Sequence, residues 1–134
     1  HPAGSIDSHD SPGLGNLVNP VIQVDLFSDF RCPYCQAYAP SFAALANDPK
    51  YKDYVAFYYH HDVIHSSAQK NHLAAHAAHL QGKFWEMHDW NYANMTVDDP
   101  NEIFAAAGAI GLDMVQFEKD YYAQTTVDYL NADK

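Results

Sequence analysis

The chain has 134 residues, of which 48% are hydrophobic and 14% aromatic, so it is long and apolar enough to bury the core of one domain. Acidic residues outnumber basic residues 17 to 7, and the formal net charge is -10. Such an acidic balance argues against nucleic-acid binding and against attachment to an anionic membrane surface, because both need a basic face.

The first half of the chain predicts a flexible N-terminal segment followed by a strand–helix–strand unit. Residues 1–20 are rich in Gly, Pro, Ser, Asp and Asn and predict a flexible N-terminal arm. Residues 21–27, VIQVDLF, are mostly apolar, as expected of a buried parallel strand. A helix is predicted to begin at Pro33, which suits the first helical position, and to kink at Pro40. Residues 54–64, YVAFYYHHDVI, predict a second buried strand.

Beyond residue 65 the pattern becomes helical. Helices are predicted over 66–82, 83–94, 97–111 and 112–134, the last as one helix or two. Ser66 or Ser67 is the expected cap of the first, and Asp98 or Asp99 that of the third. The aromatic residues of the second, KFWEMHDWNYAN, are assigned to core packing. The chain therefore divides into an arm, a β-α-β portion over 21–65 and a helical portion over 66–134.

Both cysteines of the chain, Cys32 and Cys35, lie where the first strand gives way to the helix. A cysteine at a helix N-terminus faces unpaired backbone N–H groups and the positive end of the helix dipole, which stabilise a thiolate. We therefore expect Cys32 to be the exposed nucleophile and Cys35, one turn inside the helix, to resolve the mixed disulfide. Pro33 and Tyr34 between them are expected to tune the redox potential. A redox-active Cys32–Cys35 disulfide needs no organic cofactor.

Nine histidines leave a metal-binding alternative open. Zinc sites usually have four N or S ligands, so a single cysteine pair excludes a four-cysteine site within one chain but not a site of two cysteines and two histidines. The weak candidate ligands are His72, His76 and His79, which fall on one face of the predicted helix; the alternative is that they are ordinary polar positions. Asp29 and His61 are the candidates for relaying a proton or stabilising the thiolate.

The segment DLFSDFRCPYCQAYAP (25–40) resembles the active-site segment of DsbA-like thiol–disulfide oxidoreductases of the thioredoxin superfamily. The segment QGKFWEMHD (81–89) is similar to the start of a helix in the inserted helical domain of that family. The resemblance implies a thioredoxin-like α/β fold, here an incomplete β-α-β portion, with an inserted helical domain. It also implies disulfide exchange in an extracytoplasmic compartment (periplasm, cell envelope or exterior). The implied partners are protein thiols or disulfides and a redox partner protein, with Phe30 and Tyr34 on the substrate surface.

The sequence departs from that family in its prolines. Such proteins carry a Thr-Pro or Val-Pro step after the helical block, with the proline in the cis form beside the cysteines. The last proline here is Pro100, which lies inside the predicted helical block. A sheet of two strands is marginal without a large cover. We therefore expect the chain to be an N-terminal portion of a longer protein, or to need self-association or a second chain to complete its sheet.

A second departure concerns proton transfer. Many relatives place a buried Glu or Asp six residues before the first cysteine, and this chain has Leu26 there. Asp25 is adjacent, but strand alternation directs it to the opposite face.

The rival functions are a Cys/His metal-binding protein and a truncated, non-catalytic thioredoxin-like binding module.

Overall fold

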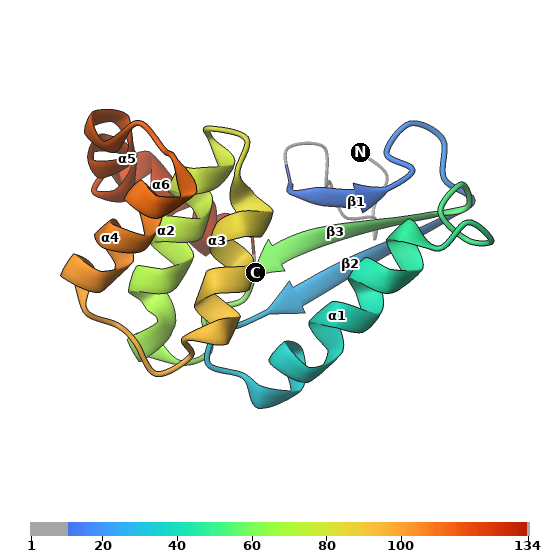
Figure 1. Cartoon of the computed structure of the whole chain (residues 1–134), viewed down its shortest axis with the longest axis horizontal. Coiled ribbons are helices and arrows are strands. Elements are labelled where there is room, and N and C mark those ends of the chain that lie inside the picture. Colours follow the sequence, from blue (N-terminus) through green and yellow to red (C-terminus); the bar gives the residue numbers. More distant parts are fainter. Residues whose placement is uncertain (1–10, 134) are drawn as a thin grey trace.

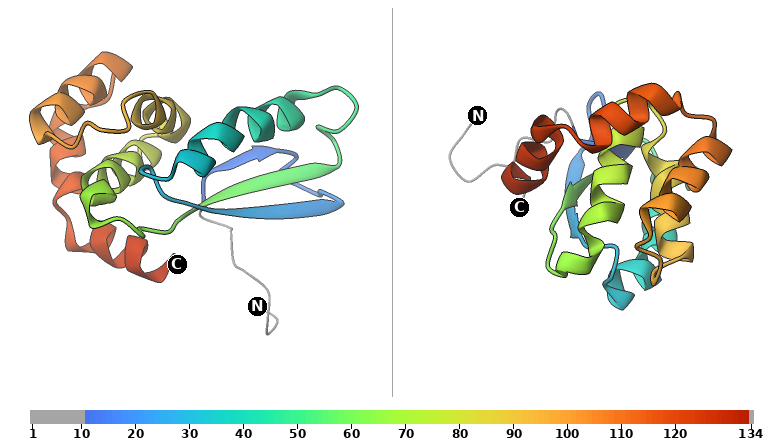
Figure 2. Two further views of the ribbon diagram at one scale, coloured as in Figure 1. Left: turned by 90° about the horizontal axis from the view of Figure 1, so that it is seen from below. Right: turned by 90° about the vertical axis from the view of Figure 1, so that its left-hand side faces the viewer.

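The computed structural model describes residues 11–133, in which a small sheet with one covering helix stands beside a block of helices (Figure 1). β2 (Ile22–Ser28) and β3 (Val55–His61) pair in parallel along their whole length. α1 (Pro33–Asn47) connects them across one face of the sheet, as Figure 2 shows, and it includes Pro40 within its length. Parallel neighbours need such a crossover, and the predicted strand–helix–strand unit is confirmed.

A third strand, β1 (Gly13–Gly15), lies in the predicted flexible arm, so that prediction is wrong for these residues. β1 pairs antiparallel with β3, the sheet order is β1-β3-β2, and the expected two-stranded sheet is corrected to three strands. Gly15 has φ 87°, and a Cβ there would lie 2.4 Å from the carbonyl oxygen of Val55. The pairing is made by backbone groups, so this glycine-rich stretch carries no side-chain signal for a strand. Residues 1–10 of the predicted arm lie outside the described residues.

The described part of the chain after residue 65 is a helical block. Its elements are a 3-10 turn (Ser66–Ala68), α2 (Gln69–His79), α3 (Phe84–Ala93), α4 (Pro100–Ile110), α5 (Met114–Tyr121) and α6 (Gln124–Ala132). The predicted serine cap is wrong, because the 3-10 turn precedes α2 and Ala68 takes its N-cap position. Asp99 caps α4 as predicted, accepting a 2.9 Å bond from the N–H of Asn101. The division of the chain into an arm, a β-α-β portion and a helical portion stays a prediction.

Aromatic side chains fill the junction between the sheet and the helical block. The ring of Phe30 is fully buried and stacks on that of Tyr59 from β3, with centroids 5.6 Å apart. It also meets the ring of Tyr92 from α3 at 5.1 Å. Burial of one such ring contributes about 1.5–3 kcal/mol. The cysteine loop is therefore held between two packed units.

The end of α6 returns to the sheet face opposite α1 (Figure 2). The His60 ring bonds Asp25 of β2 through Nε2 at 2.8 Å and Asp133 through Nδ1 at 2.7 Å. Burial lowers the pKa of His60, but these two carboxylates outweigh burial and raise that pKa above its ordinary value. Asp25 therefore bonds a side chain on the sheet face opposite α1, as its alternation with Leu26 predicts.

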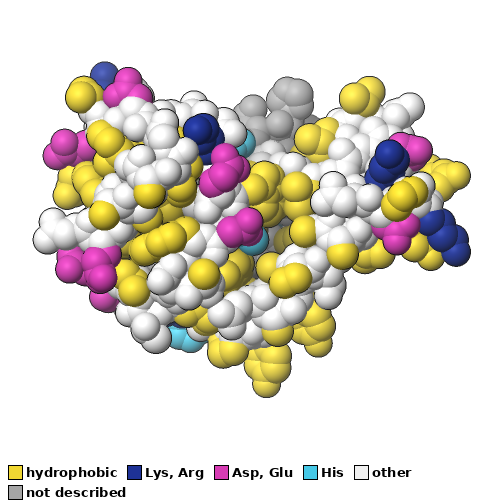
Figure 3. Space-filling view, in the orientation of Figure 1, with side chains coloured by type: hydrophobic (Ala, Val, Ile, Leu, Met, Phe, Trp, Pro, Cys, Tyr) yellow, Lys and Arg dark blue, Asp and Glu magenta, His cyan; other side chains and the backbone are white. Residues whose placement is uncertain are grey.

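The outer surface carries mainly acidic charge. On the face drawn in Figure 3, acidic side chains are spread over the helical block, and Lys and Arg side chains form no continuous patch there. Within residues 11–133, no helix combines the length and the apolar character needed to cross a bilayer. The absence of nucleic-acid partners stays a prediction from the charge balance.

Candidate active site

The two cysteines lie at the N-terminal end of α1. Cys32 takes the N-cap position, with φ -84° and ψ 115°, and Pro33 begins the helix as predicted. The Sγ atom of Cys32 accepts a hydrogen bond from the backbone N–H of Cys35 at 3.4 Å. Both side chains are free thiols at partly exposed positions. An N-cap sulfur receives an N–H group that has no partner within the helix, so this position favours a thiolate at Cys32.

The two thiols differ in acidity. Burial raises the pKa of Cys32, yet hydrogen bonds from Cys35 and from the N–H of Tyr34 outweigh burial and hold that pKa below its ordinary value. Burial, and then the contact with Cys32, raises the pKa of Cys35. An acidic, more accessible thiol in front of a less acidic one is the order that disulfide exchange uses.

The two predicted substrate-surface residues have different environments. Tyr34 is 74% exposed beside the cysteines, so a role in substrate contact stays a prediction. Phe30 is 0% exposed, and its ring lies 4.6 Å from that of His72, so its assignment to the surface is wrong. The loop after β2 directs the Phe30 ring into the core, and burial of an aromatic ring there stabilises the fold. The tuning role of Pro33 stays a prediction.

Asp29 is 1% exposed and its carboxylate is surrounded by donors. It accepts bonds from the backbone N–H groups of Arg31, Ile64 and His65 at 3.1, 3.0 and 2.7 Å. The imidazoles of His65 and His72 also reach it, at 2.9 and 3.3 Å. Burial raises the pKa of Asp29, but these hydrogen bonds outweigh burial and hold that pKa well below its usual range. A carboxylate that stays ionised has no proton to give near neutral pH, so this geometry favours an ordering role in the loop.

His61 is fully buried between β3 and α2, where its Nδ1 lies 2.8 Å from Nδ1 of His72. Burial, and then the neighbouring His72, lowers the pKa of His61 well below its ordinary value. Among the interactions within residues 11–133, none joins His61 to either thiol. This placement does not support the predicted relay through His61.

The three histidines of α2 are also directed inward or against one another. His72 and His76 are buried, and His76 stacks on Tyr129 at 4.1 Å. The ring of His79 lies 6.0 Å from that of His76. In the part of the chain that the structure describes, no group of three or more His, Cys, Asp or Glu side chains is arranged to hold a metal ion.

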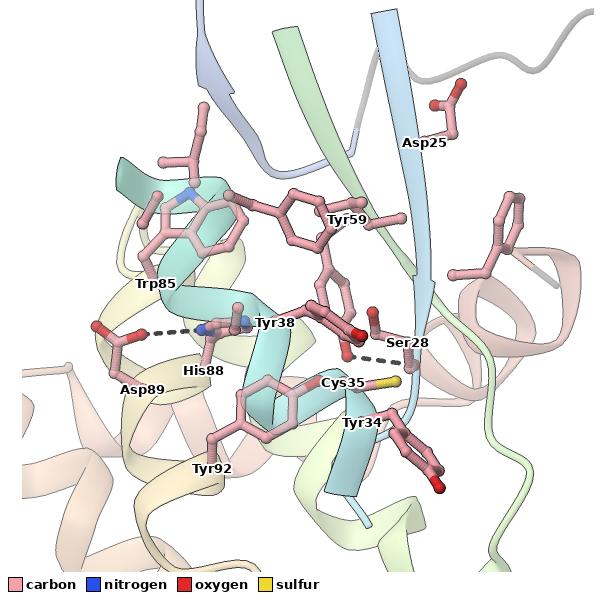
Figure 4. A pocket seen from close by; sticks show the side chains of 16 residues that line it. Asp25, Ser28, Tyr34, Cys35, Tyr38, Tyr59, Trp85, His88, Asp89 and Tyr92 are labelled. Atoms are coloured by element: carbon pink, nitrogen blue, oxygen red, sulfur yellow. Dashed lines mark hydrogen bonds and ion pairs between the residues drawn. The ribbon is translucent and has the colours of Figure 1, made fainter. Parts of the chain in front are cut away.

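A pocket that sequence reasoning missed lies between α1 and the sheet, next to Cys35 (Figure 4). Its volume is about 450 Å³. The residues that α1 contributes to its wall include Cys35, Ala39 and Ala43. Tyr34, Tyr38 and Phe42 of α1 also line the pocket, and the small side chains of Cys35, Ala39 and Ala43 leave space among these larger rings. The volume and the largely apolar wall are those of a small-molecule-sized site.

His88 and Asp89 of α3 add a polar pair to this wall. Nδ1 of His88 lies 2.9 Å from a carboxylate oxygen of Asp89, and the side chains are 8% and 79% exposed. The ring of Tyr92, also in the wall, lies 4.8 Å from that of His88. The signal in the sequence is the helical spacing of Trp85, His88 and Tyr92, which places all three on one face. The assignment of this segment to core packing hid that signal.

Comparisons with known proteins give few sequence relatives. No protein-family model matches the chain. Two curated proteins match over 100 residues at 35% identity: Na(+)/H(+) antiporter NhaA 3 of Salinispora tropica and Na(+)/H(+) antiporter NhaA 1 of Salinispora arenicola. Each match covers 75% of this chain, and the chain spans 15% of the length of these relatives.

Solved structures match nearly the whole chain. The thiol-disulfide exchange protein α-DsbA2 from Wolbachia pipientis matches with TM-score 0.79 and 20% identity, over 92% of this chain and 66% of that one. BdbD from Bacillus subtilis matches with TM-score 0.77 and 17% identity, over 95% and 74%. A thioredoxin-like oxidoreductase from Silicibacter pomeroyi matches with TM-score 0.70 and 24% identity, over 92% and 69%. At these identities the likeness is one of fold.

Proposed function

We propose that this chain, which has the DsbA-like thioredoxin fold, carries out thiol–disulfide exchange through Cys32 and Cys35. The fold predicted from the sequence is confirmed by these structural matches. One observation carries the functional proposal: Cys32 caps α1, and its sulfur accepts the N–H of Cys35 at 3.4 Å. This contact prepares one thiol for attack and holds the second thiol within reach.

In the proposed reaction, the Cys32 thiolate attacks a substrate disulfide, forming a mixed disulfide and expelling one substrate thiolate. Cys35 then loses its proton and attacks the sulfur of Cys32, which closes the Cys32–Cys35 disulfide and expels the second substrate thiolate. The substrate gains the two electrons that the cysteine pair loses, and the reverse sequence oxidises a substrate dithiol. The sulfur atoms carry the electrons, so the proposed reaction uses no organic cofactor.

The proposed substrates are secreted or envelope proteins with thiols or disulfides, and a redox partner protein resets the pair. Tyr34 and Tyr38, 74% and 59% exposed on α1, offer apolar contact beside the cysteines. The proposed location is extracytoplasmic, because disulfides persist in oxidising compartments. The similarity to segments of proteins named Na(+)/H(+) antiporters is compatible with the cell envelope.

The outer edge of β2 is where we propose that a second copy of the chain completes the sheet. In the described sheet β2 is an edge strand, and its side chains Ile22 and Phe27 are 54% and 41% exposed. A strand edge with exposed apolar side chains is a template for pairing. Sedimentation at increasing protein concentration is expected to show a dimer. A mass that stays that of the monomer contradicts pairing with a second copy, and a different chain is then the remaining partner for this edge.

Alkylation rates test the proposed site directly. In Cys35→Ser, the rate at which iodoacetamide alkylates Cys32 is expected to rise with pH at a midpoint below the value of about 8.5 for an ordinary cysteine. In Cys32→Ser, the midpoint for Cys35 is expected to lie above that value, because burial raises its pKa. A Cys32 that titrates like an ordinary cysteine contradicts the proposal and favours the non-catalytic binding module.

A further inference from the structure

Exchange requires Cys35 to lose a proton when the disulfide closes and to regain it when the disulfide opens. Burial raises the pKa of Cys35, so a nearby acceptor speeds the closing step. The residues expected from the sequence do not supply one. Leu26, at the position where many relatives carry an acid, is apolar. Hydrogen bonds hold the pKa of Asp29 well below its usual range, which makes it a weak base, and His61 lies in the interface between β3 and α2.

We propose that His88 is the proton relay residue for Cys35, acting through the pocket beneath α1, and that Asp89 positions it. This inference rests on the proposed thiol–disulfide exchange and adds to it the route of the proton. Cys35 and His88 line the same pocket of about 450 Å³ from opposite elements, α1 and α3. An imidazole is the side-chain type whose charge changes nearest to neutral pH.

The orientation of His88 suits this role. Asp89 holds Nδ1 at 2.9 Å, which places the ring proton on Nδ1 and leaves the lone pair on Nε2. Figure 4 shows Asp89 at one edge of the ring and the interior of the pocket at the other. The rings of Trp85 and Tyr92 stand edge-on to His88 at 4.9 and 4.8 Å and restrict its rotation. Nε2 is thereby fixed as an acceptor toward the pocket.

Hydroxyl groups lie near Cys35, and the pocket that Cys35 shares with His88 has room for water. Burial, and then the nearby Cys35, raises the pKa of Tyr92, and the Tyr59 hydroxyl lies against that of Tyr92. Tyr59 also donates to the carbonyl oxygen of Ser28 at 3.3 Å. Neutral phenols both donate and accept protons, and a pocket of this size with several polar partners accommodates bridging water. The route reaches solvent at Asp89, whose side chain is 79% exposed.

The remaining titratable groups of the wall are engaged elsewhere or are phenols. Asp25 belongs to the wall, but its carboxylate bonds the ring of His60 at 2.8 Å. Tyr34 and Tyr38 stand on the exposed side of α1.

In the proposed relay, the direction of proton transfer follows the direction of exchange. When the protein reduces a substrate, the proton of Cys35 passes to Nε2 of His88, the sulfur of Cys35 bonds the sulfur of Cys32, and the substrate sulfur leaves as a thiolate. When it oxidises a substrate, His88 returns a proton to the departing Cys35 thiolate.

A two-step reaction with dithiobis(nitrobenzoate) tests the relay. The reduced protein releases a first thionitrobenzoate when Cys32 attacks and a second when Cys35 closes the disulfide. His88→Gln is expected to slow the second release at least about tenfold near neutral pH, with recovery at higher pH as hydroxide replaces the relay. The first release is expected to be unchanged. The matched control is His79→Gln, which alters a histidine of α2 outside the pocket wall and is expected to keep both rates.

His88→Ala with added imidazole separates a relay from structural support. Imidazole is expected to restore the second release in proportion to its concentration, because the pocket has room for it. A second release that is unchanged in His88→Gln at every pH overturns the relay. Equal slowing of both releases without rescue also overturns it, since His88 then only supports the fold. A wild-type protein that gives no first release contradicts the proposed function instead, so the two failures are distinguishable.

Discussion

Replacing Cys32 by serine is expected to abolish thiol–disulfide exchange, lowering the rate about a thousandfold or more, as removal of a nucleophile does. The substrate sulfur bonds this one atom, and a serine hydroxyl neither ionises near neutral pH nor forms a disulfide. The measurement is the rate at which the reduced protein reduces a disulfide-linked peptide pair, followed by mass spectrometry. A variant that keeps the wild-type rate contradicts the role of Cys32.

Loss of folding does not explain this loss of activity. Serine is among the preferred N-cap residues, so Cys32→Ser retains a cap for α1. The hydrogen bond that the native sulfur accepts is 3.4 Å long, and a hydroxyl oxygen replaces that acceptor. The unfolding temperature of the variant is therefore expected to match the wild type. If the unfolding temperature drops strongly, the loss of activity does not report on the chemistry of Cys32, and the Cys35→Ser variant provides the test.

Cys35→Ser is the matched variant, because it keeps the attacking thiol and removes the resolving thiol. It is expected to accumulate a mixed disulfide between Cys32 and the peptide, visible as an added mass. The lower pKa of Cys32 and the higher pKa of Cys35 set this order of attack. If the adduct forms on Cys35 in Cys32→Ser at the same rate, the roles of nucleophile and resolving thiol are not divided as proposed.

Local patterns were enough to predict β2, α1 and β3 and the place of the cysteines between them. The apolar run before Cys32 and the proline after it act within a few residues, so the sequence itself displays them. β1 was missed because Gly13–Gly15 pairs through its backbone and carries almost no side-chain signal. Pairing between segments far apart in the sequence decides such a strand, and single-residue preferences do not report it.

The surroundings of the cysteines were harder to predict than the cysteines themselves. Phe30 is close to Cys32 along the chain, and that closeness suggested a surface role, yet its ring is 0% exposed. Asp29 is a candidate for proton relay by its place beside the cysteines, but donors from Arg31, from residues 64–65 and from His72 of α2 hold its pKa well below the usual range. His88 comes from a distant helix and reaches the pocket only through tertiary packing. Closeness to the cysteines along the chain therefore did not indicate which side chains surround them in the fold.

Replacing Asp29 by alanine is expected to lower the free energy of unfolding by about 3–5 kcal/mol, because it leaves several buried hydrogen-bond donors without an acceptor, at about 1–3 kcal/mol each. The variant leaves the N–H groups of Ile64 and His65 and the ring of His72 without their acceptor. Urea unfolding measures the loss. The matched control is Asp113→Ala, which removes an exposed cap of α5 that accepts at 3.1 and 3.2 Å and is expected to cost about 1 kcal/mol.

The dependence of this loss on pH identifies its electrostatic origin. Burial raises the pKa of Asp29, but its hydrogen bonds lower that pKa further, so the folded value lies below the unfolded value. Its contribution to stability is then complete above the unfolded pKa of about 3.9 and is lost as the pH falls through the folded pKa. The difference between wild type and Asp29→Ala is expected to stay constant from about pH 7 to about pH 5 and to shrink below about pH 4. A difference that persists unchanged in acid shows that packing around Asp29, rather than its charge, holds the loop in front of Cys32.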